Sequence, residues 1–381
     1  MSDDQVSDFV VVGGGIIGLS VAWSLVKEGA SVTVLEAGQL GGQATGAAAG
    51  MLAPLAEAKE PGPFLTLGLE SLQRYPAFVS ELHEETEIDA ELIGPGMLRV
   101  AMNDVDAYQL SQDWEWQQGI GLQSDCLSAK EVRLLEPSLG TEVRLAVRSP
   151  DERNVEPRRL LRALALACTR RGVQIVEGAP VTGFERHGSK VTSAVTPAQK
   201  YGCGSVVVAG GAWSGILGAH LNILLPVSPI RGQILSLTCL PPPIRHTIYG
   251  VAGYLVPKAD GRIIVGATED EAGFNARPDA AGIGYLLNMA GNLVPALGHA
   301  AFDSAWAGLR PASRDDMPIL GRLPGLLNAY AACGHYRNGV LLTPITGEVM
   351  AHEMLDGKPH PLTASFRPER FDTPAQVEEA R

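Results

Sequence analysis

The sequence predicts an α/β fold in which a parallel βαβ domain is interleaved with an α+β domain of antiparallel sheet. Three observations support this. A βαβ unit opens the chain, an apolar strand over 205–209 follows a strong amphipathic helix, and longer strands of antiparallel type follow over 226–270. The 381 residues suffice for one large or two medium domains.

The βαβ unit is predicted from a switch in periodicity. Phe9–Val12 is a short apolar run, as expected of a buried parallel strand, and Ile16 to Glu28 has helical periodicity. Gly29 stands where a glycine ends a helix, and the second strand covers Ser31–Glu36.

The same region has one alternative interpretation. Residues 9–26 are nearly all apolar and about long enough to cross a bilayer. Four glycines within this stretch and the near absence of basic flanking residues favour a buried strand, turn and helix instead. We therefore expect no membrane span.

Later elements follow from periodicity and turn residues. Small residues over 38–50 predict a loop packed closely against a flat ligand, rather than a floppy linker. Helices are predicted over 64–85, 129–135, 157–171, 282–293 and 338–355, and strands over 98–102, 173–178, 205–209, 232–237, 254–257, 262–267 and 329–333. The predicted division is a dinucleotide-binding domain over 1–60, 145–225 and 310–365, a substrate domain over 61–144 and 226–309, and a C-terminal tail over 366–381.

Composition excludes several classes of function. The net charge of −12 argues against nucleic acid and anionic membranes as partners. Five scattered cysteines without a CxxC pattern predict a reducing, cytoplasmic setting with neither a disulfide framework nor a metal site. The acidic start MSDDQVSD does not resemble a signal peptide.

The glycine cluster predicts a dinucleotide site. Gly13, Gly15 and Gly18 form GxGxxG between a strand and a helix, which suits a tight turn, close approach to pyrophosphate and tight helix packing. Glu36 ends the second strand, where an acid accepts ribose hydroxyls. A second GxGxxG is missing and SVVVAGG returns later in the chain, so FAD is favoured over NAD.

Several segments resemble one enzyme family. They are DFVVVGGGIIGLSVAWSLVKEGASVTVLEAG, GGQATGAAAGML, YLVPKADGRIIVGAT, AGLRPASRDDMPILG and AACGHYRNGVLLTPITG. Together they span nearly the whole chain and are similar to the glycine oxidases of bacterial thiamine biosynthesis, in the D-amino acid oxidase and sarcosine oxidase superfamily. The resemblance implies an FAD-binding Rossmann-like domain, FAD held without a covalent bond, and a homotetramer.

The resemblance also assigns residues. It implies substrate binding or catalysis by Tyr254, Arg310 and Arg337, with Met51 beside the substrate. Two residues before Tyr254, where the family pattern has a histidine, this chain has Ala252, so a pocket of different polarity is expected. Beyond the three glycines, the implied FAD contacts are Ile16, Ile17, Glu36, Ala37, Ala44, Thr45, Ala49, Gly50, Met51, Val181, His335, Tyr336, Arg337, Asn338, Gly339, Val340 and Leu341.

The chemistry of these residue types suits oxidation of an amino acid. A guanidinium such as that of Arg310 binds a carboxylate through two parallel hydrogen bonds, and the Tyr254 hydroxyl can donate a third. The alternatives are an arginine satisfied by backbone carbonyls and a tyrosine that only fills the core. GHYRNG before a predicted helix could present N–H groups to the flavin edge that becomes negative on reduction.

The expected function is oxidation of glycine or another small amino acid, with oxygen reduced to hydrogen peroxide. A second possibility is a D-amino acid or proline dehydrogenase, or a hydrogen cyanide synthase-like subunit, that passes electrons to a quinone or a partner protein. A third is a flavoprotein that keeps the fold without catalysis.

Overall fold

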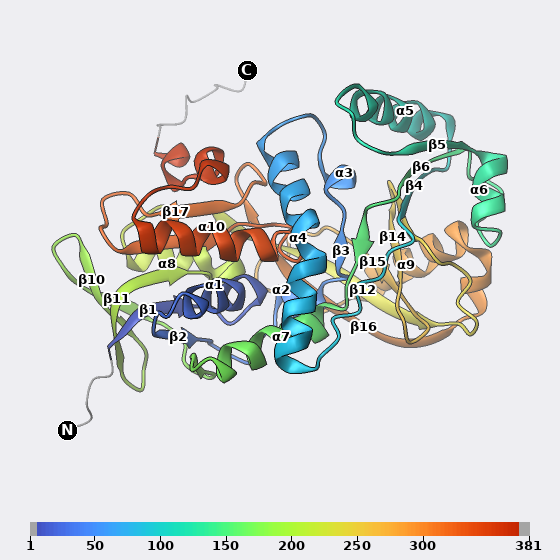
Figure 1. The fold of residues 1–381 in the computed structure, drawn as a ribbon. Coiled ribbons are helices and arrows are strands. Elements are labelled where there is room, and N and C mark those ends of the chain that lie inside the picture. Colours follow the sequence, from blue (N-terminus) through green and yellow to red (C-terminus); the bar gives the residue numbers. More distant parts are fainter. Residues whose placement is uncertain (1–5, 373–381) are drawn as a thin grey trace, which may run out of the picture.

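The computed structural model describes residues 6–372, which contain two large sheets side by side (Figure 1). The first has eight strands in the order β17-β18-β11-β1-β2-β8, with the hairpin β9–β10 attached to β11. In chain order these are β1 (Ser7–Val12), β2 (Val32–Leu35), β8 (Gln174–Val176), β9 (Gly183–His187), β10 (Lys190–Val195), β11 (Lys200–Val208), β17 (Ile319–Arg322) and β18 (Ala329–Cys333).

Strand β1 lies in the centre of the first sheet, parallel to β2 and β11. Its side chains alternate between two cores: Phe9 and Val11 join one, and Val10 and Val12 join the other. Because Val10 pairs with Val206, the prediction that the strand at 205–209 returns to the first sheet is confirmed.

Four helices bury one face of the first sheet. These are α1 (Ile16–Lys27), α4 (Pro63–Thr86), α7 (Pro157–Arg170) and α10 (Thr343–Asp356), and they share one apolar core. Helix α4 falls in the range 61–144 assigned to the substrate domain, yet its buried side chains belong to this core. The division into domains stays a proposal.

The second sheet has eight strands in the order β16-β12-β15-β14-β13-β4-β6-β5. All neighbours are antiparallel except β13 and β4. The bounds are β4 (Met97–Ala101), β5 (Asp125–Ser128), β6 (Leu145–Ser149), β12 (Val227–Thr238), β13 (Thr247–Gly250), β14 (Gly253–Pro257), β15 (Arg262–Gly266) and β16 (Ala301–Ser313).

Shorter elements complete the fold. Helix α9 (Ala280–Leu293) packs against the second sheet, while α5 (Asp104–Gly119) and α6 (Ala129–Leu135) lie at its far end (Figure 1). The remaining elements are α2 (Ala44–Ala47), α3 (Pro54–Glu57), α8 (Ser214–His220), the ribbon of β3 (Met51–Leu52) with β7 (Arg153–Asn154), and 3₁₀ turns η1 (Gly211–Trp213), η2 (Pro295–His299), η3 (Pro361–Phe366) and η4 (Pro368–Phe371). Of the predicted tail, residues 373–381 lie outside the described residues.

The structure corrects some predicted elements. The helix predicted from residue 338 begins only at Thr343, because 338–342 form turns and Pro344 favours a start in the first helical turn. The loop over 38–50 contains the single turn α2. The sequence did not predict β16 as a strand or α5 as a helix.

The apolar stretch from Phe9 to Val26 forms β1, the glycine turn and most of α1. Within residues 6–372, no helix combines the length and the apolar character that crossing a membrane requires.

Candidate active site

Two adjoining hollows lie between the sheets. The larger, about 380 Å³, extends along the carboxyl ends of β1 and β2. The smaller, about 150 Å³, lies against α1, β12, β14, β16 and the 335–340 loop. Both are bordered by Gly15, Ala44, Thr45, Ala209 and Gly211. A ligand with two ends could therefore occupy both.

Two of the three GxGxxG glycines have no room for a side chain. Gly13 has a φ of +119°, and an added Cβ would lie 2.3 Å from the carbonyl oxygen of Ala209. A Cβ on Gly18 would lie 2.0 Å from the carbonyl oxygen of Gly13, so this glycine lets α1 pack on the turn. Gly13 and Gly15 line the larger hollow, whereas Gly18 lines neither.

Glu36 supplies the acidic end of the larger hollow. Its Oε2 accepts a hydrogen bond from the Gly14 N–H at 2.7 Å, and its Oε1 accepts one from the Gly38 N–H at 2.9 Å. Both bonds fix the carboxylate at the end of β2, with Ala37 and Val181 on the same wall. A carboxylate held here suits the hydroxyls of an adenosine ribose.

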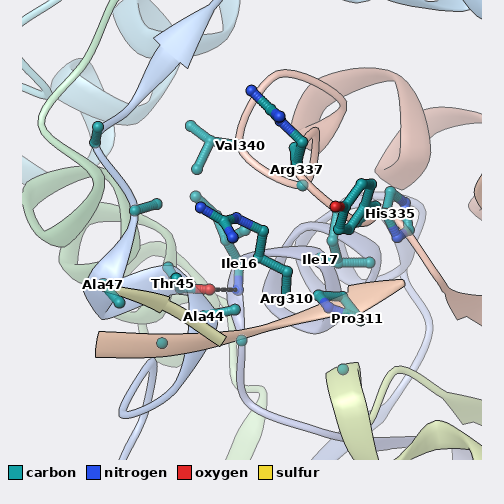
Figure 2. A pocket seen from close by; sticks show the side chains of 18 of the residues that line it. Ile16, Ile17, Ala44, Thr45, Ala47, Arg310, Pro311, His335, Arg337 and Val340 are labelled. Carbon is teal, nitrogen blue, oxygen red and sulfur yellow. Dashed lines mark hydrogen bonds between the residues drawn. The ribbon is translucent and has the colours of Figure 1, made fainter. Parts of the chain in front are cut away.

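Thr45 connects the small-residue loop to the start of α1. The Ile16 N–H donates to its Oγ1 at 3.1 Å, as the dashed line in Figure 2 shows. The other N–H groups of this first helical turn have no partner within the helix, and the helix dipole favours an anion there. The turn therefore suits a pyrophosphate.

A buried lysine fixes the next loop. Lys258 donates from Nζ to the carbonyl oxygens of Ala49, at 2.7 Å, and Val155, at 2.6 Å. Burial lowers its pKa to about 8. These bonds hold the segment of Ala49, Gly50 and Met51 as a wall of the smaller hollow.

Arg310 and Tyr254 form the polar part of that hollow. Arg310 extends from β16 into it (Figure 2), and its Nη1 donates to the Thr268 carbonyl oxygen at 3.0 Å. Tyr254 lines the same hollow, and its phenol lies close enough to Arg310 and to Arg337 for both guanidinium charges to favour the phenolate. Burial raises the pKa of the Tyr254 hydroxyl, and the charges of Arg310 and Arg337 offset only part of that effect, so the phenol keeps its proton at neutral pH. A carboxylate here would meet two donor groups.

Gly232 makes room for the Arg310 guanidinium. A Cβ at this position on β12 would lie 2.4 Å from Arg310 Nη2. The glycine therefore lets the guanidinium lie flat against the sheet.

Arg337 approaches the same hollow from the loop before α10 (Figure 2). Its Nη2 donates to the Tyr249 hydroxyl at 2.7 Å and lies 3.2 Å from Oε1 of Glu57. Its Nη1 lies 3.7 Å from Oε2 of Glu269. Burial disfavours the charged guanidinium, but Glu57, Tyr249 and Glu269 outweigh burial and raise the pKa of Arg337.

Only some residues of the 335–341 loop line the smaller hollow. His335 is buried, and burial lowers its pKa to about 3, so the ring is neutral near pH 7. His335, Tyr336, Arg337, Gly339 and Val340 line the smaller hollow. Asn338 and Leu341 line neither hollow: the Asn338 N–H bonds the His335 carbonyl oxygen, and the Leu341 carbonyl oxygen accepts from Ser71.

Two further findings bear on the predictions. Ala252 lies exposed in the turn between β13 and β14 and lines neither hollow. Within residues 6–372 no group of three or more His, Cys, Asp or Glu side chains could hold a metal ion.

Comparison with known proteins places this site in a family. Residues 8–353 match the sequence profile described as FAD dependent oxidoreductase. The chain belongs to this family of FAD-dependent oxidoreductases. Its cofactor is FAD, and the glycine-lined turn, Glu36 and the small-residue loop fit that molecule.

Relatives within the FAD-dependent oxidoreductases are closely similar over most of their length. Glycine oxidase from Bacillus licheniformis is 36% identical over 92% of this chain and 94% of its own. The crystal structure of glycine oxidase from Geobacillus kaustophilus superimposes with a TM-score of 0.93 at 32% identity, covering 96% of this chain and 98% of that one.

A bifunctional ThiO/ThiG protein from Synechocystis is 37% identical over 96% of this chain. The chain spans only 54% of that relative's length. This oxidoreductase therefore corresponds to one part of a larger protein in that organism.

Sequence reasoning missed the side chains that support the site. Glu57, Lys258, Glu269 and Tyr249 were not predicted, although three of them border Arg337 and the fourth fixes the Ala49 loop. Lys258 follows β14 just before a turn, where a lysine is ordinary, so no local pattern in the sequence marked it or its three companions.

Proposed function

We propose that this protein oxidises glycine, or a closely similar small amino acid, to the imine, which water converts to glyoxylate and ammonia. The observation that carries the proposal is that Arg310 and Tyr254 line one small hollow beside the small-residue loop. The similarity to glycine oxidases over more than nine-tenths of the chain supports the choice of substrate.

The chain's residues have three tasks in this reaction. Arg310 binds the substrate carboxylate through its guanidinium, and Tyr254 donates its hydroxyl to the same group. Apolar walls that include Ile16, Ile234 and Val340 exclude water from the α-carbon. Bound FAD supplies the acceptor for the hydride that leaves the α-carbon.

The proposed transfer of electrons and protons needs no metal and no strong base. The α C–H bond breaks with its electron pair, the amine nitrogen loses a proton, and the C=N bond of the imine forms. Oxygen then takes up two electrons and two protons and leaves as hydrogen peroxide. His335 lines the smaller hollow, but burial lowers its pKa to about 3, so its imidazole is a weak acceptor for the amine proton.

Further parts of the proposal concern the protein's setting. We propose that FAD binds without a covalent bond, because the segment AGLRPASRDD lacks a cysteine. The resemblance to glycine oxidases of thiamine biosynthesis supports a cytoplasmic homotetramer that works in that pathway.

The test is peroxide release by the FAD-loaded protein with glycine, sarcosine and small D-amino acids. Turnover of glycine with one peroxide per glyoxylate supports the proposal. Reduction of an artificial dye without peroxide would instead indicate a dehydrogenase. Absence of any reaction with every amine would leave only a non-catalytic flavoprotein.

A further inference from the structure

The two arginines of the smaller hollow have different surroundings. Arg310 has the Thr268 carbonyl oxygen and the Tyr254 phenol as neighbours, and within residues 6–372 it forms no ion pair with a carboxylate. Arg337 lies between the carboxylates of Glu57 and Glu269. Arg310 thus offers a cation to an incoming anion, whereas Arg337 already has two counter-ions.

The charges around Arg337 do not cancel. One guanidinium faces two carboxylates, which leaves a net charge of −1 in this acidic cluster, defined as Glu57, Arg337 and Glu269. Glu57 contributes most to the negative potential of the cluster, because its side chain is only 14% exposed, whereas that of Glu269 is 52% exposed and screened by water.

Glu57 cannot easily swing away from the cluster. It ends α3, whose backbone is tied down from two sides. The Leu55 N–H donates to the buried Glu152 carboxylate at 2.7 Å, and the Leu55 carbonyl oxygen accepts from Arg99 and Gln117. Glu57 is therefore a fixed part of the smaller hollow, whereas Glu269 is half-exposed and lines neither hollow.

We propose that the acidic cluster selects against substrates with a second carboxylate, by occupying Arg337 and by repelling the extra charge. Glycine carries one carboxylate, which Arg310 binds, so the cluster does not repel a second negative charge on this substrate. Glu57 and Glu269 are then specificity-determining residues. This inference rests on the proposed function for its natural substrate class.

The experiment compares two N-substituted glycines. Iminodiacetate carries a second carboxylate on the amine, and N-isobutylglycine has an arm of the same shape without charge. We expect Glu57→Gln to raise the ratio of kcat/KM for iminodiacetate over N-isobutylglycine by roughly tenfold, and Glu269→Gln to raise it less, because exposed charges are screened. Glu271→Gln removes the same charge from an exposed residue two positions away and should leave the ratio unchanged.

A double variant separates release of Arg337 from simple loss of negative charge. Adding Arg337→Met to Glu57→Gln should abolish most of the gain, because no cation remains for the second carboxylate. An unchanged ratio in both glutamate variants, or an equal rise in Glu271→Gln, would overturn the inference. The exposed Glu269 keeps the test available if Glu57→Gln does not fold.

Binding of unreactive acids gives an independent readout. Malonate has two carboxylates and acetate has one, and each can be titrated against the FAD-loaded protein through the flavin spectrum. Glu57→Gln should tighten malonate binding relative to acetate by roughly tenfold. A wild type that fails to oxidise glycine would sink the proposed function alone, whereas equal malonate and acetate responses in every variant would sink this inference alone.

Discussion

Replacing Arg310 by Met should weaken use of glycine far more than it weakens the fold. The substitution keeps an unbranched apolar stem and removes the guanidinium that faces the smaller hollow. Truncating one partner of a buried charge pair costs about 2–5 kcal/mol. Arg310 is only half-buried, so the lower part of that range, about 2–3 kcal/mol, applies.

This energy converts directly into kinetics. At 1.4 kcal/mol per factor of ten, kcat/KM for glycine should fall roughly 30- to 150-fold. Most of the fall should come from KM, since the carboxylate is bound before and during hydride transfer. The assay is steady-state peroxide release over a range of glycine concentrations, with bound FAD measured in parallel.

Arg314→Met provides the matched control. Arg314 lies four residues further along, exposed, with its guanidinium over the Phe371 ring and outside both hollows. It should keep wild-type kinetics. The reasoning about Arg310 fails if Arg310→Met, with normal FAD content, changes kcat/KM by less than about threefold.

Three further substitutions test other parts of the structure. Gly18→Ala should lower FAD affinity at least roughly tenfold, because its Cβ would lie 2.0 Å from the Gly13 carbonyl oxygen; an unaltered FAD titration would contradict this. Lys258→Met leaves two buried carbonyl oxygens without a donor and should lower the free energy of unfolding in urea by about 2–4 kcal/mol; an unchanged unfolding midpoint would show that these hydrogen bonds do not stabilise the fold. Burial lowers the pKa of His335 to about 3, so between pH 3 and 6.5 the unfolded chain binds a proton that the folded chain does not, and stability falls on acidification. That contribution is about 2 kcal/mol between pH 7.5 and 5, and His335→Gln should flatten the pH dependence of unfolding by this amount; an identical slope would refute it.

Local patterns made the cofactor half of the molecule predictable. GxGxxG with Glu36 at the end of the next strand is set by short-range geometry, and the structure has the corresponding turn, helix and acid. The return of a strand at 205–209 followed from its apolar run, since a strand covered on both faces needs one.

The supporting residues of the site could not be predicted in the same way. Arg310 stood out in WAGLRP, but the strand that carries it, β16, shows no clear alternation, because its first residues are exposed on both sides. Glu57 and Glu269 lie more than 200 residues apart in the sequence and meet only at Arg337. Such contacts depend on how the two sheets pack and leave no trace in local spacing.

The start of α10 shows why hydrophobic periodicity misplaces the ends of helices. Periodicity extends back to residue 338, but the turn around His335 and the position of Pro344 delay the helix to Thr343. Helix boundaries depend on capping and turn geometry, which hydrophobic periodicity does not report. Gly339 and Val340, which line the smaller hollow, therefore belong to a turn and not to helix α10.

The most direct test of the central claim is anaerobic mixing of the FAD-loaded protein with glycine while the flavin absorbance is followed. Arg310 and Tyr254, acting on the carboxylate of glycine, should lead to loss of the yellow oxidised spectrum, with glyoxylate and ammonia formed in equal amounts. Flavin that stays yellow at saturating glycine, in protein that holds a full complement of FAD, would contradict the account.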